Sequence, residues 1–170
     1  NETQGEVICY DSKPIIAYYH STSGGFTANI EEVWNGNPVP YLKMVDDTGN
    51  GDESPRSVWS FSIKKSEFSK KVGFNVNGII IEEMKNGRVT LVKIFGDKSM
   101  TISGNELRKI IGYNKIFSTI FDVFDFENEL IFAGRGSGHG VGMAQWGACG
   151  LAKKGKNYKE IVKFYYTGVE

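Results

Sequence analysis

The sequence predicts a mixed α+β fold, mainly antiparallel β with a short central helix and two C-terminal helices. The strongest hairpin signal in the chain is Asn86-Gly87, which two apolar runs flank. Residues 58–63 alternate apolar and polar side chains with period two, as a half-buried strand does. Beyond residue 143, apolar residues recur instead at helical spacing.

The first third of the chain contains two predicted strands and two predicted loops. Residues 5–10 and 14–20 are β-branched and aromatic runs joined by Asp-Ser-Lys, which indicates a hairpin. Small polar residues and glycines at 20–25 predict a structured loop. Residues 35–56, rich in proline and in glycine next to acidic residues, predict a second loop that lies on the surface.

The middle of the chain is predicted to be mostly sheet. Ser103 or Asn105 can cap a helix that ends at Gly112, and Ser66 can cap another. The predicted strands cover residues 58–63, 78–84, 88–95, 100–103, 117–124 and 130–133, and the central helix falls within residues 62–72.

The last forty residues change from strand to helix patterns. A glycine-rich loop at 134–142 leads into a predicted helix over 143–153, which Gly155 ends. Asn157 caps a second helix that ends before Gly168. At 170 residues the chain fits one domain or two small ones, and we expect residues 1–170 to form a single globular unit.

Composition excludes several classes of protein. With 20 basic and 20 acidic residues the net charge is zero, and 40% of the chain is hydrophobic, so it is not intrinsically disordered. It has no broad positive field for nonspecific nucleic-acid binding. No apolar run approaches the ~20 residues that span a bilayer. The chain begins without an initiator methionine or signal pattern, which suggests a processed protein or a piece of a longer one.

The two cysteines, Cys9 and Cys149, match neither a zinc-ribbon spacing nor a redox pair. Two buried free thiols are the preferred interpretation, and one long-range disulfide is the alternative.

The only two histidines, His20 and His139, each lie within a Gly/Ser loop. Because such loops lie at the surface, a functional role and a structural role are both open for either histidine. Their similar settings favour a shared site. A metal would need further ligands that no spacing supplies, and Ser21 and Ser23 have no Gly-x-Ser-x-Gly context for a nucleophile.

The glycine-rich loop before the first C-terminal helix has two interpretations. A helix N-terminus can bind anions, but the loop lacks the Gly-Lys-Ser/Thr ending of a phosphate loop, and Arg135 is its only basic residue. Close backbone packing also explains the glycines. Aromatic residues near both loops, such as Tyr18, Trp34 and Tyr166, suit sugar rings, although most of them are expected in the core.

Two long motifs resemble the stage II sporulation protein D (SpoIID) family and its amidase-enhancer relatives. The first is Ala-Tyr-Tyr-His-Ser-Thr-Ser-Gly-Gly at 17–25, followed by Glu32, Val33, Trp34 and Pro-Tyr-Leu at 40–42. The second is Gly-Ser-Gly-His-Gly-Val-Gly-Met-Ala-Gln-Trp-Gly-Ala at 136–148. They occur in the family's order, and the resemblance covers nearly the whole chain.

The resemblance implies a lytic transglycosylase that cleaves stem-peptide-free peptidoglycan glycan strands during sporulation engulfment. One glutamic acid protonates the glycosidic oxygen and then, as a base, assists attack by the muramic acid C6 hydroxyl. Ordinary glycosidases use two carboxylates instead. The implied partners are glycan strands, the SpoIIP amidase and the SpoIIM membrane protein, outside the cytoplasm, with a membrane anchor in the full-length protein.

The sequence departs from the family pattern in one respect. The catalytic glutamate of the family lies in a Glu-Met-Pro-like motif before an Ala/Arg-rich helix, upstream of the first motif, and this chain contains neither. Glu83-Met84 is followed by Lys85 and has the wrong neighbours. We therefore expect a C-terminal part of a longer enzyme, with no cofactor in this piece and any zinc site upstream.

The two motifs are expected to line one groove, where His20 and His139 approach each other. Glu31 and Glu32, taken as the only carboxylates close to the first loop, are expected to stay ionised. Competing classes are a non-catalytic cell-wall-binding or amidase-activating module and a structural protein that binds nothing. The predicted substrate-binding residues are Tyr19, His20, Ser21, Ser23, Gly24, Gly25, Tyr41, Ser137, His139, Gln145 and Trp146.

Overall fold

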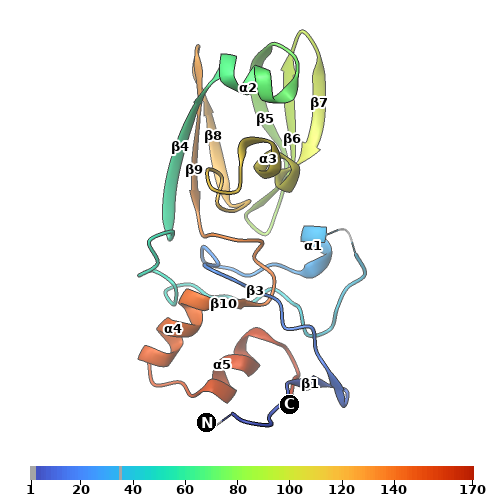
Figure 1. Cartoon of the computed structure of the whole chain (residues 1–170), viewed down its shortest axis with the longest axis vertical. Coiled ribbons are helices and arrows are strands. Elements are labelled where there is room, and N and C mark those ends of the chain that lie inside the picture. The colour runs from blue at the N-terminus through green and yellow to red at the C-terminus, as the bar shows by residue number, and fades with distance from the viewer. Residues whose placement is uncertain (1–2, 35) are drawn as a thin grey trace. The chain divides into compact units, whose positions relative to one another are not determined.

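A computed structural model of the chain describes residues 3–34 and 36–170 (Figure 1). Contacts between Cα atoms divide it into two compact units. The first unit comprises Asn1–Ser54 and Gly140–Glu170, and the second comprises Pro55–His139. Each has its own apolar core. Our expectation of a single globular unit stays a prediction.

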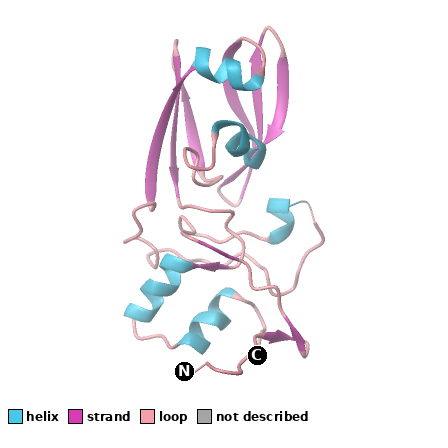
Figure 2. Cartoon of the chain, in the orientation of Figure 1, coloured by secondary structure: helices cyan, strands magenta, loops and turns pink. Residues whose placement is uncertain are grey.

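The second unit contains the long strands of the chain (Figure 2). One antiparallel sheet has the order β4-β9-β8 and the other the order β5-β6-β7. The strands are β4 (Val58–Lys64), β5 (Val76–Lys85), β6 (Arg88–Gly96), β7 (Ser99–Ser103), β8 (Phe121–Asp125) and β9 (Glu129–Arg135), and the helices are α2 (Lys65–Val72) and α3 (Gly104–Ile111).

The predicted alternation of β4 is confirmed. Trp59 and Ile63 are buried in the core of the second unit, while Val58 is 70% exposed. The indole N–H of Trp59 also donates a 2.9 Å hydrogen bond to the carbonyl oxygen of Gly136. The core is completed by Phe68 of α2, Leu107 of α3 and strand residues such as Phe132.

Local signals placed most boundaries of the second unit correctly, but the strand predicted at 117–124 begins only at Phe121, because Ser118 forms a turn in which its hydroxyl accepts the backbone N–H of Ile120. Asn86 and Gly87 have φ of 50° and 73°, and they connect β5 to β6 as predicted. Ser103 caps α3, since its hydroxyl accepts the backbone N–H of Glu106 and the Glu106 carboxylate accepts the N–H of Ser103. These hydrogen bonds from Ser103 hold the pKa of Glu106 below its usual value.

One predicted cap in this unit was wrong. Helix α2 begins at Lys65 with Lys64 in the N-cap position, not at Ser66. The reason is that β4 continues to Lys64 and passes into the helix without a loop, so the chain has no room for a later start. The backbone N–H of Lys65 is satisfied by the carbonyl oxygen of Asn128 instead of by a side-chain cap.

The first unit is mostly loop, with short strands and three described helices (Figure 2). Asn157 caps the last helix in a capping box with Glu160, as predicted. Its core includes Ala28, Leu42, Val141, Tyr165 and Tyr166. The elements are β1 (Cys9–Tyr10), β2 (Lys13–Pro14), β3 (Tyr19–His20), α1 (Ile30–Trp34), β10 (Met143–Ala144), α4 (Gln145–Lys153) and α5 (Tyr158–Tyr165).

Two expectations for the first unit need correction. The predicted hairpin shrinks to the two-residue strands β1 and β2, while β3 pairs in parallel with β10. A turn in which the N–H of Tyr18 bonds to the carbonyl of Ile16 separates β2 from β3. Residues 35–56 are not wholly at the surface, because Leu42 packs in the core and Asp47 and Ser54 form buried hydrogen bonds.

Both cysteines are free thiols, as preferred over a disulfide. Cys9 is half-buried, whereas Cys149 is exposed on α4, so its predicted burial was wrong. Among the helices of residues 3–34 and 36–170, none is both long enough and apolar enough to cross a membrane.

Candidate functional site

The two sequence motifs meet inside the first unit. Strand β3 of the first motif pairs in parallel with β10 of the second (Figure 1). Tyr19 lies opposite Met143, and His20 lies opposite Ala144. The pairing extends beyond the strands. Backbone N–H groups of Met143 and Trp146 donate to the carbonyls of Tyr18 and Ser21, at 3.1 and 3.0 Å. Segments about 120 residues apart in sequence therefore form one backbone framework.

Glycine at position 142 permits this close approach. Its φ is 71°, and a Cβ atom there would overlap the carbonyl oxygen of Tyr18. One step earlier, Ala28 forms a parallel bridge with Val141, and its N–H donates to Gly140 at 2.8 Å. In the part of the glycine-rich loop that belongs to the first unit, close backbone packing therefore explains the glycine at position 142.

The imidazole of His20 is buried, with 4% of the residue exposed. Its Nδ1 lies 3.2 Å from the carbonyl oxygen of Val141. Because a carbonyl oxygen can only accept, Nδ1 carries the proton in this hydrogen bond. The second motif therefore fixes the orientation of the histidine in the first.

Hydroxyl groups of the first loop bond to one another and to Ser54. Ser21 Oγ lies 3.2 Å from Thr22 Oγ1, which in turn lies 2.6 Å from Ser54 Oγ. Thr22 and Ser54 are buried, and Ser21 is half-buried. This chain of hydroxyls attaches the loop to the end of the 35–56 region and keeps Ser21 nearest to solvent.

A buried carboxylate holds the first loop from its other side. Asp47 is 1% exposed and accepts hydrogen bonds from Ser23 Oγ and the Tyr165 hydroxyl, each at 2.6 Å, and from Asn50 Nδ2 at 3.1 Å. We call Asp47, Ser23, Asn50 and Tyr165 the Asp47 network. It joins the loop, the 47–50 segment and α5.

The Asp47 network affects the pKa of the Tyr165 hydroxyl. Burial, followed by the hydrogen bond to Asp47 and the charge of that carboxylate, raises the pKa of the Tyr165 hydroxyl above its usual value. The phenol is therefore a permanent donor to Asp47 at physiological pH.

Helix α4 lies directly against the Asp47 network. A Cβ atom at Gly147 would overlap both the Tyr165 hydroxyl and the Asp47 carboxylate. The first two residues of the helix are Gln145, which is exposed, and Trp146, which is half-buried. The network thus fixes the helix that carries two of the predicted binding residues.

The predicted site residues fall into three groups. Tyr19 is 60% exposed and Gln145 is exposed, so both can meet a ligand. His20 and Ser23 are buried and hold the framework, and Tyr41 packs on Tyr10 with ring centroids 5.5 Å apart. The third group is the remaining loop residues. Gly24 and Gly25 have positive φ, and Ser21 and Trp146 are half-buried. Ser137 and His139 are also half-buried, but they belong to the second unit. The approach of His20 to His139 stays a prediction.

Sequence reasoning missed Asp47. The prediction that Glu31 and Glu32 are the only carboxylates close to the first loop is wrong, because the Asp47 carboxylate accepts a hydrogen bond from Ser23. No local pattern separates Asp47 from its neighbour Asp46, which is exposed. The distinction arises from partners 24 and 118 residues away in the chain.

The network is suited to support and not to proton transfer. Asp47 is 1% exposed and already accepts hydrogen bonds from three side chains, so a ligand cannot reach its carboxylate. On α1, Oε1 of Glu32 accepts a hydrogen bond from Asn29 Nδ2 at 2.9 Å. In the described part of the chain, no group of three or more His, Cys, Asp or Glu side chains could hold a metal ion.

Comparison with known proteins confirms the predicted resemblance. The chain is 35% identical to stage II sporulation protein D of Bacillus subtilis (strain 168) over 173 residues, covering 99% of the chain and 48% of that protein. For stage II sporulation protein D of Bacillus amyloliquefaciens the identity is 34% with the same coverage. The amidase enhancer of Bacillus subtilis (strain 168) is 26% identical over 98% of the chain and 31% of its own length.

The chain spans about half the length of the stage II sporulation protein D relatives. No protein-family model matches it.

Proposed function

We propose that the protein containing this chain is a lytic transglycosylase that cleaves stem-peptide-free peptidoglycan glycan strands during sporulation. One observation carries the proposal: the two motifs shared with the SpoIID family are joined by β3 and β10 into one framework. Relatives named for sporulation and for amidase enhancement support a role in cell-wall remodelling.

In this proposal the chain binds and orients the glycan. Tyr19 presents an exposed ring at the start of β3, and Gln145 presents an amide at the start of α4. An aromatic face covers the apolar side of a sugar ring, and an amide bonds to its hydroxyl edge. The buried hydrogen bonds of His20 and of the Asp47 network keep β3 and α4, which carry these two residues, in place.

The catalytic acid is proposed to lie in the rest of the longer protein. A glutamic acid there donates its proton to the glycosidic oxygen as the bond to C1 breaks. The resulting carboxylate then takes the proton of the muramic acid C6 hydroxyl while that oxygen bonds to C1, which gives the 1,6-anhydro end. One carboxyl suffices because it is protonated before the first step and ionised before the second, and water is not the nucleophile.

The first prediction tests the place of the acid. The chain alone should release no anhydro-ended products from stem-peptide-free glycan strands, whereas the longer parent protein should, as mass spectrometry of the digests would show. Cleavage by the chain that Glu31→Gln or Glu32→Gln abolishes would mean that the acid lies in this piece. Cleavage by neither protein would favour a non-catalytic module.

The second prediction tests the glycan surface. Tyr19→Ala should weaken binding of the chain to glycan strands about five- to tenfold, the worth of one aromatic contact. Because Tyr19 is mostly exposed, the melting temperature should not change. Phe126→Ala removes a ring of similar exposure, 53%, from the second unit and is the matched control. Equal binding by both variants would remove Tyr19 from the site.

The similarity to the amidase enhancer supports a second candidate function, an amidase-activating module. The two candidates differ in the residues that precede this chain in the whole protein. A Glu-Met-Pro-like motif there favours the transglycosylase, and its absence favours the activating module. In either case we propose an extracytoplasmic location, with an anchor outside this chain and with the SpoIIP amidase and the SpoIIM membrane protein as partners.

A further inference from the structure

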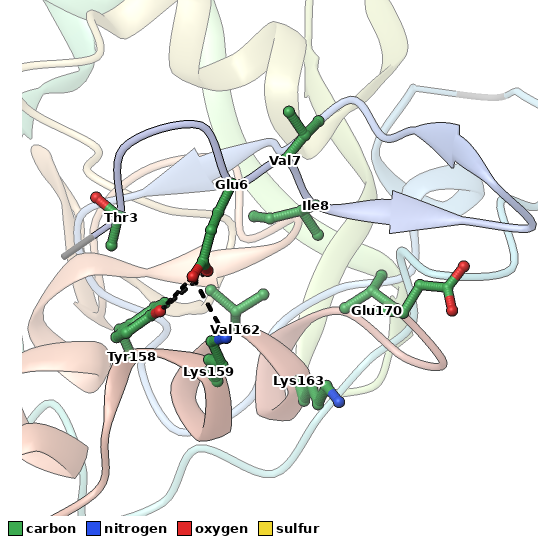
Figure 3. A pocket seen from close by; sticks show the side chains of 10 residues that line it. Thr3, Glu6, Val7, Ile8, Tyr158, Lys159, Val162, Lys163 and Glu170 are labelled. Atoms are coloured by element: carbon green, nitrogen blue, oxygen red, sulfur yellow. Dashed lines mark hydrogen bonds and ion pairs between the residues drawn. The ribbon is translucent and has the colours of Figure 1, made fainter.

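A separate pocket lies in the first unit, between the N-terminal segment, α5 and the last two residues of the chain (Figure 3). Its volume of about 450 Å³ lies within the range of small-ligand sites. None of the predicted glycan-binding residues lines it. The lining residues are Thr3, Glu6, Val7, Ile8, Tyr158, Lys159, Val162, Lys163, Val169 and Glu170.

One part of the pocket is closed by internal bonds. Both oxygens of the Glu6 carboxylate lie 2.9 Å from the Tyr158 hydroxyl, and Oε1 lies 3.3 Å from Lys159 Nζ. Figure 3 shows these three side chains converging on one point. The charges of Glu6 and Lys159 therefore satisfy each other and are not available to a ligand.

The remaining two charges of the pocket are available. Lys163 and Glu170 are exposed, and neither forms an ion pair with the other or with any other residue that the structure describes. Lys163 is cationic and Glu170 is anionic, so the charges of the four charged side chains that the described residues contribute to the pocket sum to zero. A ligand with a single charge can pair with only one of Lys163 and Glu170, whereas a ligand with one charge of each sign can pair with both.

The walls beside these charges are apolar. Ile8 and Val162 are half-buried, Val169 is buried, and Val7 is 61% exposed. A mostly aliphatic lining with few polar groups favours a ligand whose body is apolar.

We propose that this pocket binds a short zwitterionic peptide with an apolar side chain. The peptide's ammonium group pairs with Glu170, its carboxylate pairs with Lys163, and its side chain lies against Val162 and Val169. The site is independent of glycan cleavage, so its test requires no enzymatic activity.

The test is an NMR titration of the chain with the dipeptide Leu-Leu, following the methyl signals of Val162 and Val169. Saturable shifts at millimolar peptide are expected. Acetylating the amino end or amidating the carboxyl end should each weaken binding by about fivefold, the worth of one exposed ion pair. A parallel titration with D-Ala-D-Ala asks which source supplies the peptide. Tighter binding of that probe assigns the site to cell-wall peptides, and equal or weaker binding assigns it to peptides in general.

Because Lys163 and Glu170 are exposed, substitutions at these positions should leave the fold intact. Lys163→Gln and Glu170→Gln should each reproduce the loss seen on blocking the matching end of the peptide. The double exchange Lys163→Glu with Glu170→Lys should restore binding of Leu-Leu in the reverse direction. Lys13→Gln, an exposed lysine outside the pocket, should change nothing. Absence of shifts, or equal affinity for free and blocked dipeptides, would overturn the proposal.

Discussion

Asp47→Asn is expected to lower the free energy of unfolding of the first unit by about 3 kcal/mol, since hydrogen bonds to charged groups are worth about 1.5–3 kcal/mol each. The asparagine would place an amide N–H₂ where Ser23, Tyr165 or Asn50 now donates. At least one of these partners would have to turn from donor to acceptor, and the hydrogen bonds that remain would lose their charge assistance. Hydrogen exchange measured by mass spectrometry resolves the two units and should show faster exchange in the first unit only.

Asp46→Asn is the matched control, because it makes the same chemical change one residue earlier. Asp46 is exposed, and its carboxylate accepts the backbone N–H of Thr48 at 2.9 Å. Hydrogen bonds from Thr48 lower the pKa of Asp46, but water can replace them. We therefore expect only a small change. Equal effects of the two substitutions would show that burial of Asp47 does not control stability.

The same variant separates support from catalysis. If the Asp47 network only holds the first loop and α4 in place, Ser23→Ala and Asp47→Asn should weaken glycan binding together, and their effects should not add. A residue that donated a proton would instead change the pH profile of cleavage in the parent protein. We expect that profile to keep its shape in Asp47→Asn, with only the affinity reduced.

Local signals explain which parts of the fold the sequence predicted. The Asn86-Gly87 turn and the caps at Ser103 and Asn157 depend on residues within a few positions of each other, and the structure confirms all three. The period-two pattern of β4 is equally local. These features require no knowledge of the rest of the chain.

The framework of the candidate site depends on contacts that no local pattern encodes. Strands β3 and β10 are each two residues long, which is too short to show a period. They pair in parallel although all residues of the second unit lie between them in the sequence. The similar settings of His20 and His139 and the resemblance to a family were the two reasons to expect that the motifs act together. The buried role of Asp47 was missed for the same reason, because its partners are distant in sequence.

Gly150→Ala is expected to destabilise the first unit by about 3 kcal/mol, at the upper end of what overpacking costs. In an exposed helix the same change stabilises by about 1 kcal/mol, so the sign itself is informative. A Cβ atom at position 150 of α4 would overlap the backbone carbonyl oxygen of Asn50, which cannot rotate away as a side chain can. Lys154 ties the same two segments together through Gly49 O and Asn50 Oδ1.

Separating α4 from the 49–50 segment would also disturb the hydrogen bond between Asn50 and Asp47, so glycan binding should weaken along with stability. Gly36→Ala provides the control, since a Cβ atom there meets no atom within 4 Å. Urea unfolding of both variants, followed by hydrogen exchange in the first unit, measures the difference. If Gly150→Ala is as stable as Gly36→Ala, α4 can move away from the 49–50 segment without a loss of stability. Close packing of α4 would then not be the feature that orients Gln145 and Trp146.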